Sequence, residues 1–145
     1  MRVATFNIRH GETRDGVVDL RRLAAACEGL EADVLALHEV DRRMRRTRWA
    51  DTPRRVGRRA GMARAFAPAL RRGRLGRYGN ALLARGAIGD VEALRFPSPR
   101  EDRGAVLATV WVGGRPLSVA ATHLSVHRDE RDAQLDALLT GCPAP

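Results

Sequence analysis

Apolar runs separated by polar turns predict a chain rich in β-strands. Seven runs have the length and the apolar, often β-branched content that is typical of strands. They span residues 2–8, 33–38, 63–67, 78–84, 88–95, 106–112 and 117–124. Gly113 and Gly114 separate the last two runs, which favours a hairpin at that point. The pattern therefore predicts several short strands, some of them antiparallel neighbours.

The stretches between these runs predict two helices in the first half of the chain. Asp19 is a suitable N-cap for a helix over residues 20–30, where apolar residues recur on one face. Asp51 and Pro53 stand in the order of a helix start, because proline fits the first turn, and this helix should end near Gly61. Helices that alternate with strands indicate the α/β class.

The second half of the chain adds one more predicted helix. Residues 127–140 form an amphipathic pattern in which Leu135, Leu138 and Leu139 should face inward. Residues 69–77 are rich in arginine and glycine, and they predict a loop between two strands. The sequence contains no internal repeat and no linker typical of a domain boundary, so we expect a single α/β domain.

Length and composition agree with one globular domain. The 145 residues are 44% hydrophobic, which is enough for a core that buries about 70% of the unfolded surface. No run of about 18 apolar residues occurs, so no membrane span is predicted, and the N-terminus lacks the features of a signal peptide. Cys27 and Cys142 have no metal-binding spacing, and two free thiols suit a reducing compartment. We therefore expect a cytoplasmic protein.

The net charge of +9 comes from one stretch of the sequence. Residues 42–77 hold 14 arginines against a single acid, Asp51, and we call them the arginine-rich block. Such a block either binds an anionic partner, such as nucleic acid or an anionic lipid surface, or forms a solvated, mobile face. Aromatic residues are few here (Trp49 and Phe66, with Tyr78 at the edge of the block), so the sequence gives little support for a base-stacking platform.

Three of the predicted strands finish in polar side chains that can carry chemistry. Asn7, Glu39 and His123 each follow an apolar run, and strand ends at one rim of a sheet converge on a cleft. An amide, a carboxylate and an imidazole together predict a hard-cation site beside an acid/base or phosphate-binding group. Taken singly, Asn7 can cap a turn, Glu39 can be a surface acid and His123 can be a hydrogen-bonded rim residue.

The order of these pieces resembles the endonuclease/exonuclease/phosphatase superfamily of metal-dependent phosphoesterases. The matching stretches are TFNIRHG, DGVVDLRRLA, ADVLALHEVD, YGNALLAR, RGAVLATV and ATHLS, which extend over nearly the whole chain. The resemblance implies the N-terminal part of a four-layer α/β/β/α sandwich, with two mixed, largely antiparallel sheets face to face. It also implies hydrolysis of phosphodiester or phosphomonoester bonds.

The resemblance assigns the amide and the carboxylate to a metal site. Asn7 and Glu39 match the family's metal-site asparagine and glutamate, where the ion is usually Mg²⁺ and can be Mn²⁺. The family usually has glutamine before this glutamate, whereas this chain has His38, which can donate a hydrogen bond to Glu39 as glutamine would. A protonated His38 would repel the cation and make its binding depend on pH.

The resemblance assigns four further residues to the substrate. Asn80 and Tyr78 fall where the family lines its phosphate pocket. His123 matches a histidine that contacts the scissile phosphate in several branches, and Arg103 falls where a basic residue often lies near the substrate. The substrate class stays open, because family members act on nucleic acids, lipids and inositol phosphates with one core.

Two motifs of the family's second half are absent from the sequence. The Gly-Asp-x-Asn motif supplies a carboxylate for the water nucleophile and a phosphate-binding asparagine, and the Ser-Asp-His motif holds the metal and the phosphate. Residues 89–92, Gly-Asp-Val-Glu, lack the asparagine and precede the ATHLS stretch that they should follow. We therefore expect residues 1–145 to be an incomplete, C-terminally truncated domain that is inactive alone. The alternative is a non-catalytic remnant that binds nucleic acid or anionic surfaces through the arginine-rich block.

Overall fold

Helices and strands alternate along the first half of the chain, as the sequence pattern predicts. The computed structural model describes residues 1–141, so Cys142 and the proline-containing end lie outside it. The elements are β1 (Val3–Asn7), η1 (Arg9–Gly11), α1 (Leu20–Gly29), β2 (Val34–Arg42), η2 (Arg45–Thr47), α2 (Thr52–Ala60), β3 (Ala63–Arg72), β4 (Gly76–Ala84), β5 (Ile88–Phe96), β6 (Arg103–Val112), β7 (Arg115–Thr122) and α3 (Arg128–Gly141). Here η marks a short 3₁₀ turn.

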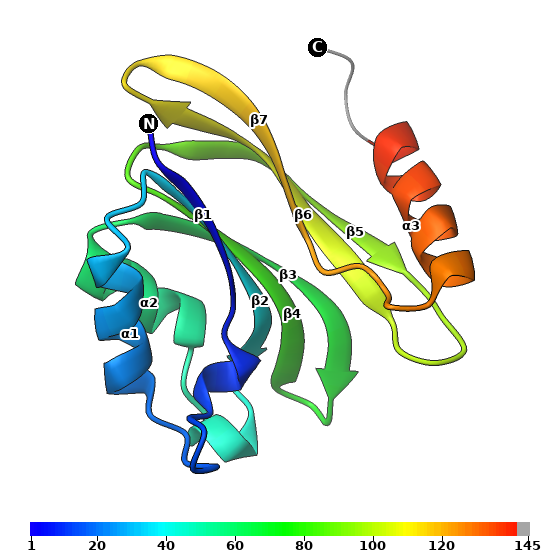
Figure 1. Cartoon of the computed structure of the whole chain (residues 1–145), viewed down its shortest axis with the longest axis horizontal. Helices are drawn as coiled ribbons and strands as arrows, with labels where there is room; N and C mark the ends of the chain where they lie inside the picture. Colours follow the sequence, from blue (N-terminus) through cyan, green and yellow to red (C-terminus); the bar gives the residue numbers. More distant parts are fainter. Residues whose placement is uncertain (142–145) are drawn as a thin grey trace.

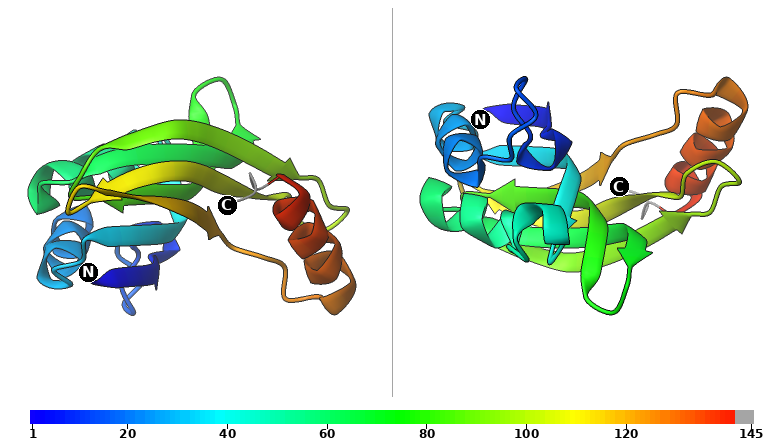
Figure 2. Two further views of the ribbon diagram at one scale, coloured as in Figure 1. Left: turned by 90° about the horizontal axis from the view of Figure 1, so that it is seen from above. Right: turned by 90° about the horizontal axis from the view of Figure 1, so that it is seen from below.

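The strands form two sheets that pack face to face. Within residues 1–141 the first sheet has the order β1-β2-β4-β3 and the second has the order β5-β6-β7. Only β1 and β2 pair in parallel, and the other pairs are antiparallel. Helices α1 and α2 cover the outer face of the first sheet, and α3 lies at one end of the second (Figures 1 and 2). The mixed α/β class with largely antiparallel sheets is confirmed.

The core has one layer on each side of the first sheet. Leu35, Leu37 and Leu83 pack against α1 and α2, whereas Leu82 and Val106 meet between the two sheets. Strand β4 is therefore buried on both faces, because neighbouring side chains of a strand point to opposite sides. Strands β1 and β7 lie at sheet edges, and within residues 1–141 each pairs with a single strand.

The predicted helix starts and the predicted hairpin are confirmed. The Asp19 carboxylate accepts hydrogen bonds from two backbone N–H groups at the start of α1, and Asp51 accepts one at the start of α2. Each such cap stabilises its helix by about 1 kcal/mol. Gly61 caps the end of α2 in the left-handed conformation that glycine favours. Gly113 and Gly114 form the turn between β6 and β7, both with positive φ.

The prediction of a loop over residues 69–77 is wrong. Strand β3 continues to Arg72 and β4 begins at Gly76, so most of this stretch belongs to a hairpin. The register shifts between Pro68 and Leu70, which agrees with the missing N–H donor of proline. A stretch rich in arginine is typical of a loop, but charged side chains also occur at the exposed end of a hairpin.

Helix α3 forms where it is predicted, but its inward face is narrower than expected. Leu138 is buried, whereas Leu135 is 42% exposed and Leu139 is 65% exposed. Buried Gln134 accepts a hydrogen bond from the Ser125 backbone N–H at 2.8 Å. The prediction that all three leucines face inward is therefore wrong, because within residues 1–141 the helix packs along one side only, beside β5.

The remaining sequence expectations concern cysteine and membranes. Cys27 is a free, buried cysteine, and burial raises the pKa of its thiol to about 11. In the part of the chain that the structure describes, no helix is long and apolar enough to cross a membrane.

Candidate functional site

The sequence pattern predicted Glu39 at the end of its strand, and that prediction is wrong. Glu39 lies in a β-bulge within β2. Strand β2 continues to Arg42, and its register against β4 shifts between Leu37 and Val40. Leu37 and Val40 both pack in the core between the first sheet and its helices. The two residues between them, His38 and Glu39, form the bulge and lie outside this core. Glu39 has φ of +57°, a strained conformation for a residue other than glycine. The bulge thus re-aims the carboxylate toward the rim.

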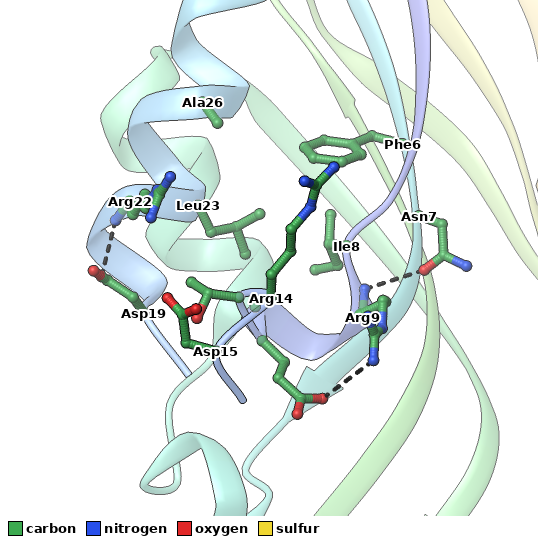
Figure 3. Close-up of a pocket in the computed structure, with 13 residues that line it drawn as sticks. Phe6, Asn7, Ile8, Arg9, Arg14, Asp15, Asp19, Arg22, Leu23 and Ala26 are labelled. Carbon is green, nitrogen blue, oxygen red and sulfur yellow. Dashed lines mark hydrogen bonds and ion pairs between the residues drawn. The ribbon is translucent and has the colours of Figure 1, made fainter. Parts of the chain in front are cut away.

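Asn7 holds the Glu39 carboxylate at this rim. Parallel pairing places Asn7 beside His38, and the Asn7 Nδ2 donates a hydrogen bond to Glu39 Oε1 at 2.7 Å. The Asn7 Oδ1 accepts a hydrogen bond from the Arg9 backbone N–H at 3.1 Å (Figure 3). Within residues 1–141 the other oxygen of Glu39, Oε2, has no hydrogen-bond partner. The structure therefore brings the two predicted metal-site residues together and leaves one carboxylate oxygen available.

His38 does not donate a hydrogen bond to Glu39, so that prediction is wrong. Its Nε2 lies 2.8 Å from the Thr5 Oγ1, and its Nδ1 lies 3.1 Å from the Asn80 Oδ1. The Asn80 Nδ2 donates to the Gly104 carbonyl at 2.7 Å, which leaves the amide oxygen of Asn80 facing His38. Because that oxygen can only accept, His38 Nδ1 carries the proton and its Nε2 accepts from Thr5.

This chain of hydrogen bonds joins four strands across the two sheets. It runs from Thr5 on β1 through His38 on β2 and Asn80 on β4 to Gly104 on β6. Burial lowers the pKa of His38 below its ordinary value, which favours the neutral ring that the chain requires. The fixed position of the Asn80 amide therefore depends on His38, a role that the sequence alone did not suggest.

Five of the six residues singled out from the sequence line one hollow at the rim between the sheets. The complete lining consists of Glu39, Ala69, Tyr78, Gly79, Asn80, Asp102, Arg103, Gly104 and His123. The sixth residue, Asn7, is hydrogen-bonded to Glu39. Gly79 is required here, because a Cβ at this position would lie within 3.0 Å of the backbone of β3. Residues from β2, β4, β6 and the end of β7 therefore converge on one small site.

Arg103 fixes the hydrogen-bonding state of His123. Its Nη1 lies 3.4 Å from His123 Nδ1, and its Nη2 lies 3.2 Å from a Glu101 oxygen. Because a guanidinium only donates, His123 Nδ1 must accept and the ring proton sits on Nε2. Burial and the positive charge of Arg103 lower the pKa of His123. His123 is therefore a neutral donor, and the Arg103 Nε is buried without a partner in residues 1–141.

The sequence analysis missed an ion pair beside the hollow, in which the carboxylate is buried and the arginine is partly exposed. Asp41 is fully buried, and Arg46 binds it through Nε at 2.7 Å and through Nη2 at 2.8 Å. The same guanidinium lies over the Tyr78 ring, 5.5 Å from its centre. Burial, followed by the nearby Glu39 charge, raises the pKa of Tyr78, so its hydroxyl stays protonated. Only the continuation of β2 past Glu39 could have indicated a buried Asp41.

A larger hollow lies between β1 and α1, next to the open edge of β1 (Figure 3). Phe6, Ile8 and Leu23 give it apolar walls, and charged residues such as Arg14 lie around them. Asn7 is the one candidate site residue that lines it. The larger hollow is therefore distinct from the rim where the other five residues converge.

The donor set fits part of a hard-cation site. Among residues 1–141, no three His, Cys, Asp or Glu side chains are grouped closely enough to hold a metal ion. Mg²⁺ nevertheless commonly binds through one or two carboxylates, with waters and substrate phosphate completing its octahedron. The available Glu39 oxygen, held in place by Asn7, fits the protein's share of such a site.

Comparison with known proteins identifies the fold. A model of the endonuclease/exonuclease/phosphatase family matches residues 4–144. The structure is similar to an endonuclease/exonuclease/phosphatase from Beutenbergia cavernae DSM 12333, with a TM-score of 0.78 and 24% identity over 99% of this chain and 44% of that chain. It is also similar to an endonuclease/exonuclease/phosphatase family protein from Leptotrichia buccalis C-1013-b, with a TM-score of 0.71 and 14% identity over 99% of this chain and 62% of that chain.

A third similar structure has a bound product. It is TDP2 from D. rerio complexed with single strand DNA product, with a TM-score of 0.66 and 18% identity over 97% of this chain and 55% of that chain. This chain therefore spans less than two thirds of each of these three proteins. No curated protein sequence matches it.

Proposed function

Because the chain belongs to the endonuclease/exonuclease/phosphatase family, we propose that its rim site takes part in the hydrolysis of a phosphate ester. The observation that carries this proposal is the single hollow in which Glu39 lies near Tyr78, Arg103 and His123. A carboxylate for a cation beside several hydrogen-bond donors is the arrangement that phosphoryl transfer requires, because its catalysis is mainly positioning and charge stabilisation.

Each residue has a distinct part in this proposal. His123 donates from Nε2 and Arg103 from its guanidinium to the non-bridging oxygens of the phosphate. Tyr78 adds a hydroxyl donor, since its raised pKa keeps it protonated. Glu39, held by Asn7, would hold Mg²⁺ or Mn²⁺, and that ion would supply Lewis-acid polarisation of the phosphate.

We further propose that the chain carries only part of the catalytic apparatus. Its sequence contains neither the Gly-Asp-x-Asn nor the Ser-Asp-His motif, so it lacks the carboxylate for the water nucleophile. Residues 1–145 would then form an incomplete domain that binds a phosphate ester without turning it over. A "completed domain" can be built by fusing the segment of a family relative that carries both motifs after residue 141.

A second candidate function is non-catalytic binding of an anionic partner through the arginine-rich block. Of its 14 arginines, Arg42, Arg46 and Arg59 are the three that form ion pairs within the described residues. Unpaired guanidinium groups are available to phosphates. Similarity to TDP2 complexed with single strand DNA product favours nucleic acid over an anionic lipid surface as the partner.

Mg²⁺ should stabilise the wild-type chain but not the Glu39→Gln variant. The free carboxylate oxygen of Glu39 is the group that an ion would bind, and glutamine removes its charge. With one protein carboxylate, we expect a dissociation constant of about 1 mM, at the weak end for oxygen ligands. The unfolding temperature, measured with and without Mg²⁺ and Mn²⁺, checks this. Glu92→Gln, on β5 of the other sheet, is the matched control, and equal shifts in Glu39→Gln and wild type would contradict a cation at Glu39.

A further inference from the structure

Four arginines line a hollow between the start of α1 and the loop that contains η2. They are Arg21, Arg46, Arg48 and Arg55, and the lone acid in the lining is Asp19. The Asp19 carboxylate is already engaged, because it accepts two backbone hydrogen bonds of 3.0 Å at the helix start. Among residues 1–141, only Arg46 of the four forms an ion pair. We call this cavity the arginine hollow.

The loop beside the arginine hollow holds an arginine and an exposed tryptophan in a strained conformation. Arg48 and Trp49 have φ of +51° and +60°, and Trp49 is 59% exposed. Backbone hydrogen bonds fix the turn, from Trp49 N–H to the Met44 carbonyl at 2.8 Å and from Ala50 N–H to the Thr47 carbonyl at 3.0 Å. Strained residues of this kind often lie at ligand-binding positions.

This loop is anchored next to the candidate active site. Arg46 lines the arginine hollow, and its guanidinium binds the buried Asp41 and lies over the ring of Tyr78, which lines the rim site. In Figure 1 the turn of η2 lies at the same end of the molecule as the loop that precedes α1. Arg46 therefore links the lining of the arginine hollow to that of the rim site.

We propose that the arginine hollow and Trp49 bind single-stranded nucleic acid. Arg21, Arg48 and Arg55 contact backbone phosphates, and the indole of Trp49 stacks on a base, which is the usual combination at single-strand sites. The composition of the block gave little support for a stacking platform of several aromatic residues, whereas the present proposal needs one exposed indole, that of Trp49. The inference rests on the proposed function in one respect, because it takes the bound strand to be the molecule whose phosphate ester enters the rim site.

Binding of fluorescein-labelled oligo-dT, followed by anisotropy in EDTA, tests this proposal. In about 0.1 M salt the double variant Arg48→Gln/Arg55→Gln should bind about 20-fold more weakly, and its log–log salt slope should be shallower by about 1.4, because each lost phosphate contact contributes about 0.7. Trp49→Ala should bind about 10-fold more weakly at every salt concentration. All of these side chains are exposed, so unfolding temperatures should match wild type.

Matched controls separate a site from general charge. Arg115→Gln/Arg128→Gln makes the same charge change on β7 and α3, and Trp111→Ala removes the exposed indole of β6. Both should bind within 2-fold of wild type. Three outcomes would each overturn the proposal. They are an equal loss of binding in the control variants, wild-type binding by the test variants, and preferential binding to phosphatidylserine vesicles. EDTA removes any cation from Glu39, so these outcomes are independent of the Mg²⁺ test of the rim site.

Discussion

Replacing His123 with alanine should lower kcat by about 10²-fold or more in the completed domain. The imidazole is neutral because Arg103 donates to its Nδ1 and burial opposes its charging. Its Nε2–H is therefore available to a phosphate oxygen on which charge develops, and alanine removes that donor. The rate of hydrolysis of a generic phosphodiester at saturating substrate measures the loss.

The neighbouring histidine provides the control for this variant. His127→Ala removes an exposed imidazole that the structure places just before α3 and outside the hollow, so kcat should stay near the wild-type value. A second measurement follows the tautomer of His123. Arg103→Leu removes the donor to Nδ1, so the side-chain ¹⁵N chemical shifts of His123 should change. A His123→Ala variant with near wild-type turnover would show that His123 is only a hydrogen-bonded rim residue.

Replacing Arg46 with methionine should lower the free energy of unfolding by about 3 kcal/mol. Asp41 is fully buried and depends on the two short hydrogen bonds from Arg46, so the variant leaves a buried carboxylate without its partner. Asp41→Asn should cost less, because the Arg46 side chain is 43% exposed and can turn to water. Urea denaturation, with the midpoint and slope fitted together, measures both values.

A surface ion pair is the control for this stability effect. Arg59 and Glu28 lie 2.8 Å apart, but both side chains are about half exposed, so Arg59→Met should cost less than about 1 kcal/mol. Equal losses for Arg46→Met and Arg59→Met would show that the Asp41 pair contributes no more than a surface contact.

The sequence predicted the fold well wherever local chemistry decides the structure. Asp19 and Asp51 mark helix starts because a short carboxylate satisfies free N–H groups, and that requires no knowledge of distant strands. The loop over 69–77 and the inward leucines of α3 depend on which strand lies alongside. Composition cannot supply that information, so both predictions failed while the helix starts and the hairpin at Gly113 succeeded.

The candidate site was predictable in its members but not in its connections. Apolar runs that end in Asn7, Glu39 and His123 indicated convergence, and the structure brings these residues to one rim. The bulge at Glu39 could not be predicted, because it arises from the pairing of Val40 with Gly79 on a strand far along the chain. The link from His38 to Asn80 follows from that pairing, so the local comparison with glutamine gave the wrong partner.

The arginine-rich block shows a third kind of limit. Its composition left binding and simple solvation equally open, since counts do not tell which arginines are paired. The structure separates Arg46, which is bound to Asp41, from Arg48 and Arg55, which line the arginine hollow. It also places Trp49 in an exposed, hydrogen-bonded turn, which no count of aromatic residues indicates.

The most direct test of the proposed function is the turnover of a phosphodiester by the completed domain, with and without EDTA, beside the same assay on the chain alone. We predict Mg²⁺-dependent turnover by the completed domain, which EDTA abolishes and Glu39→Gln lowers by about 10²-fold or more. We predict no turnover by the chain alone. Turnover by the completed domain that neither EDTA nor Glu39→Gln affects would contradict the cation site, and EDTA-sensitive turnover by the chain alone would contradict the proposal that its catalytic apparatus is incomplete.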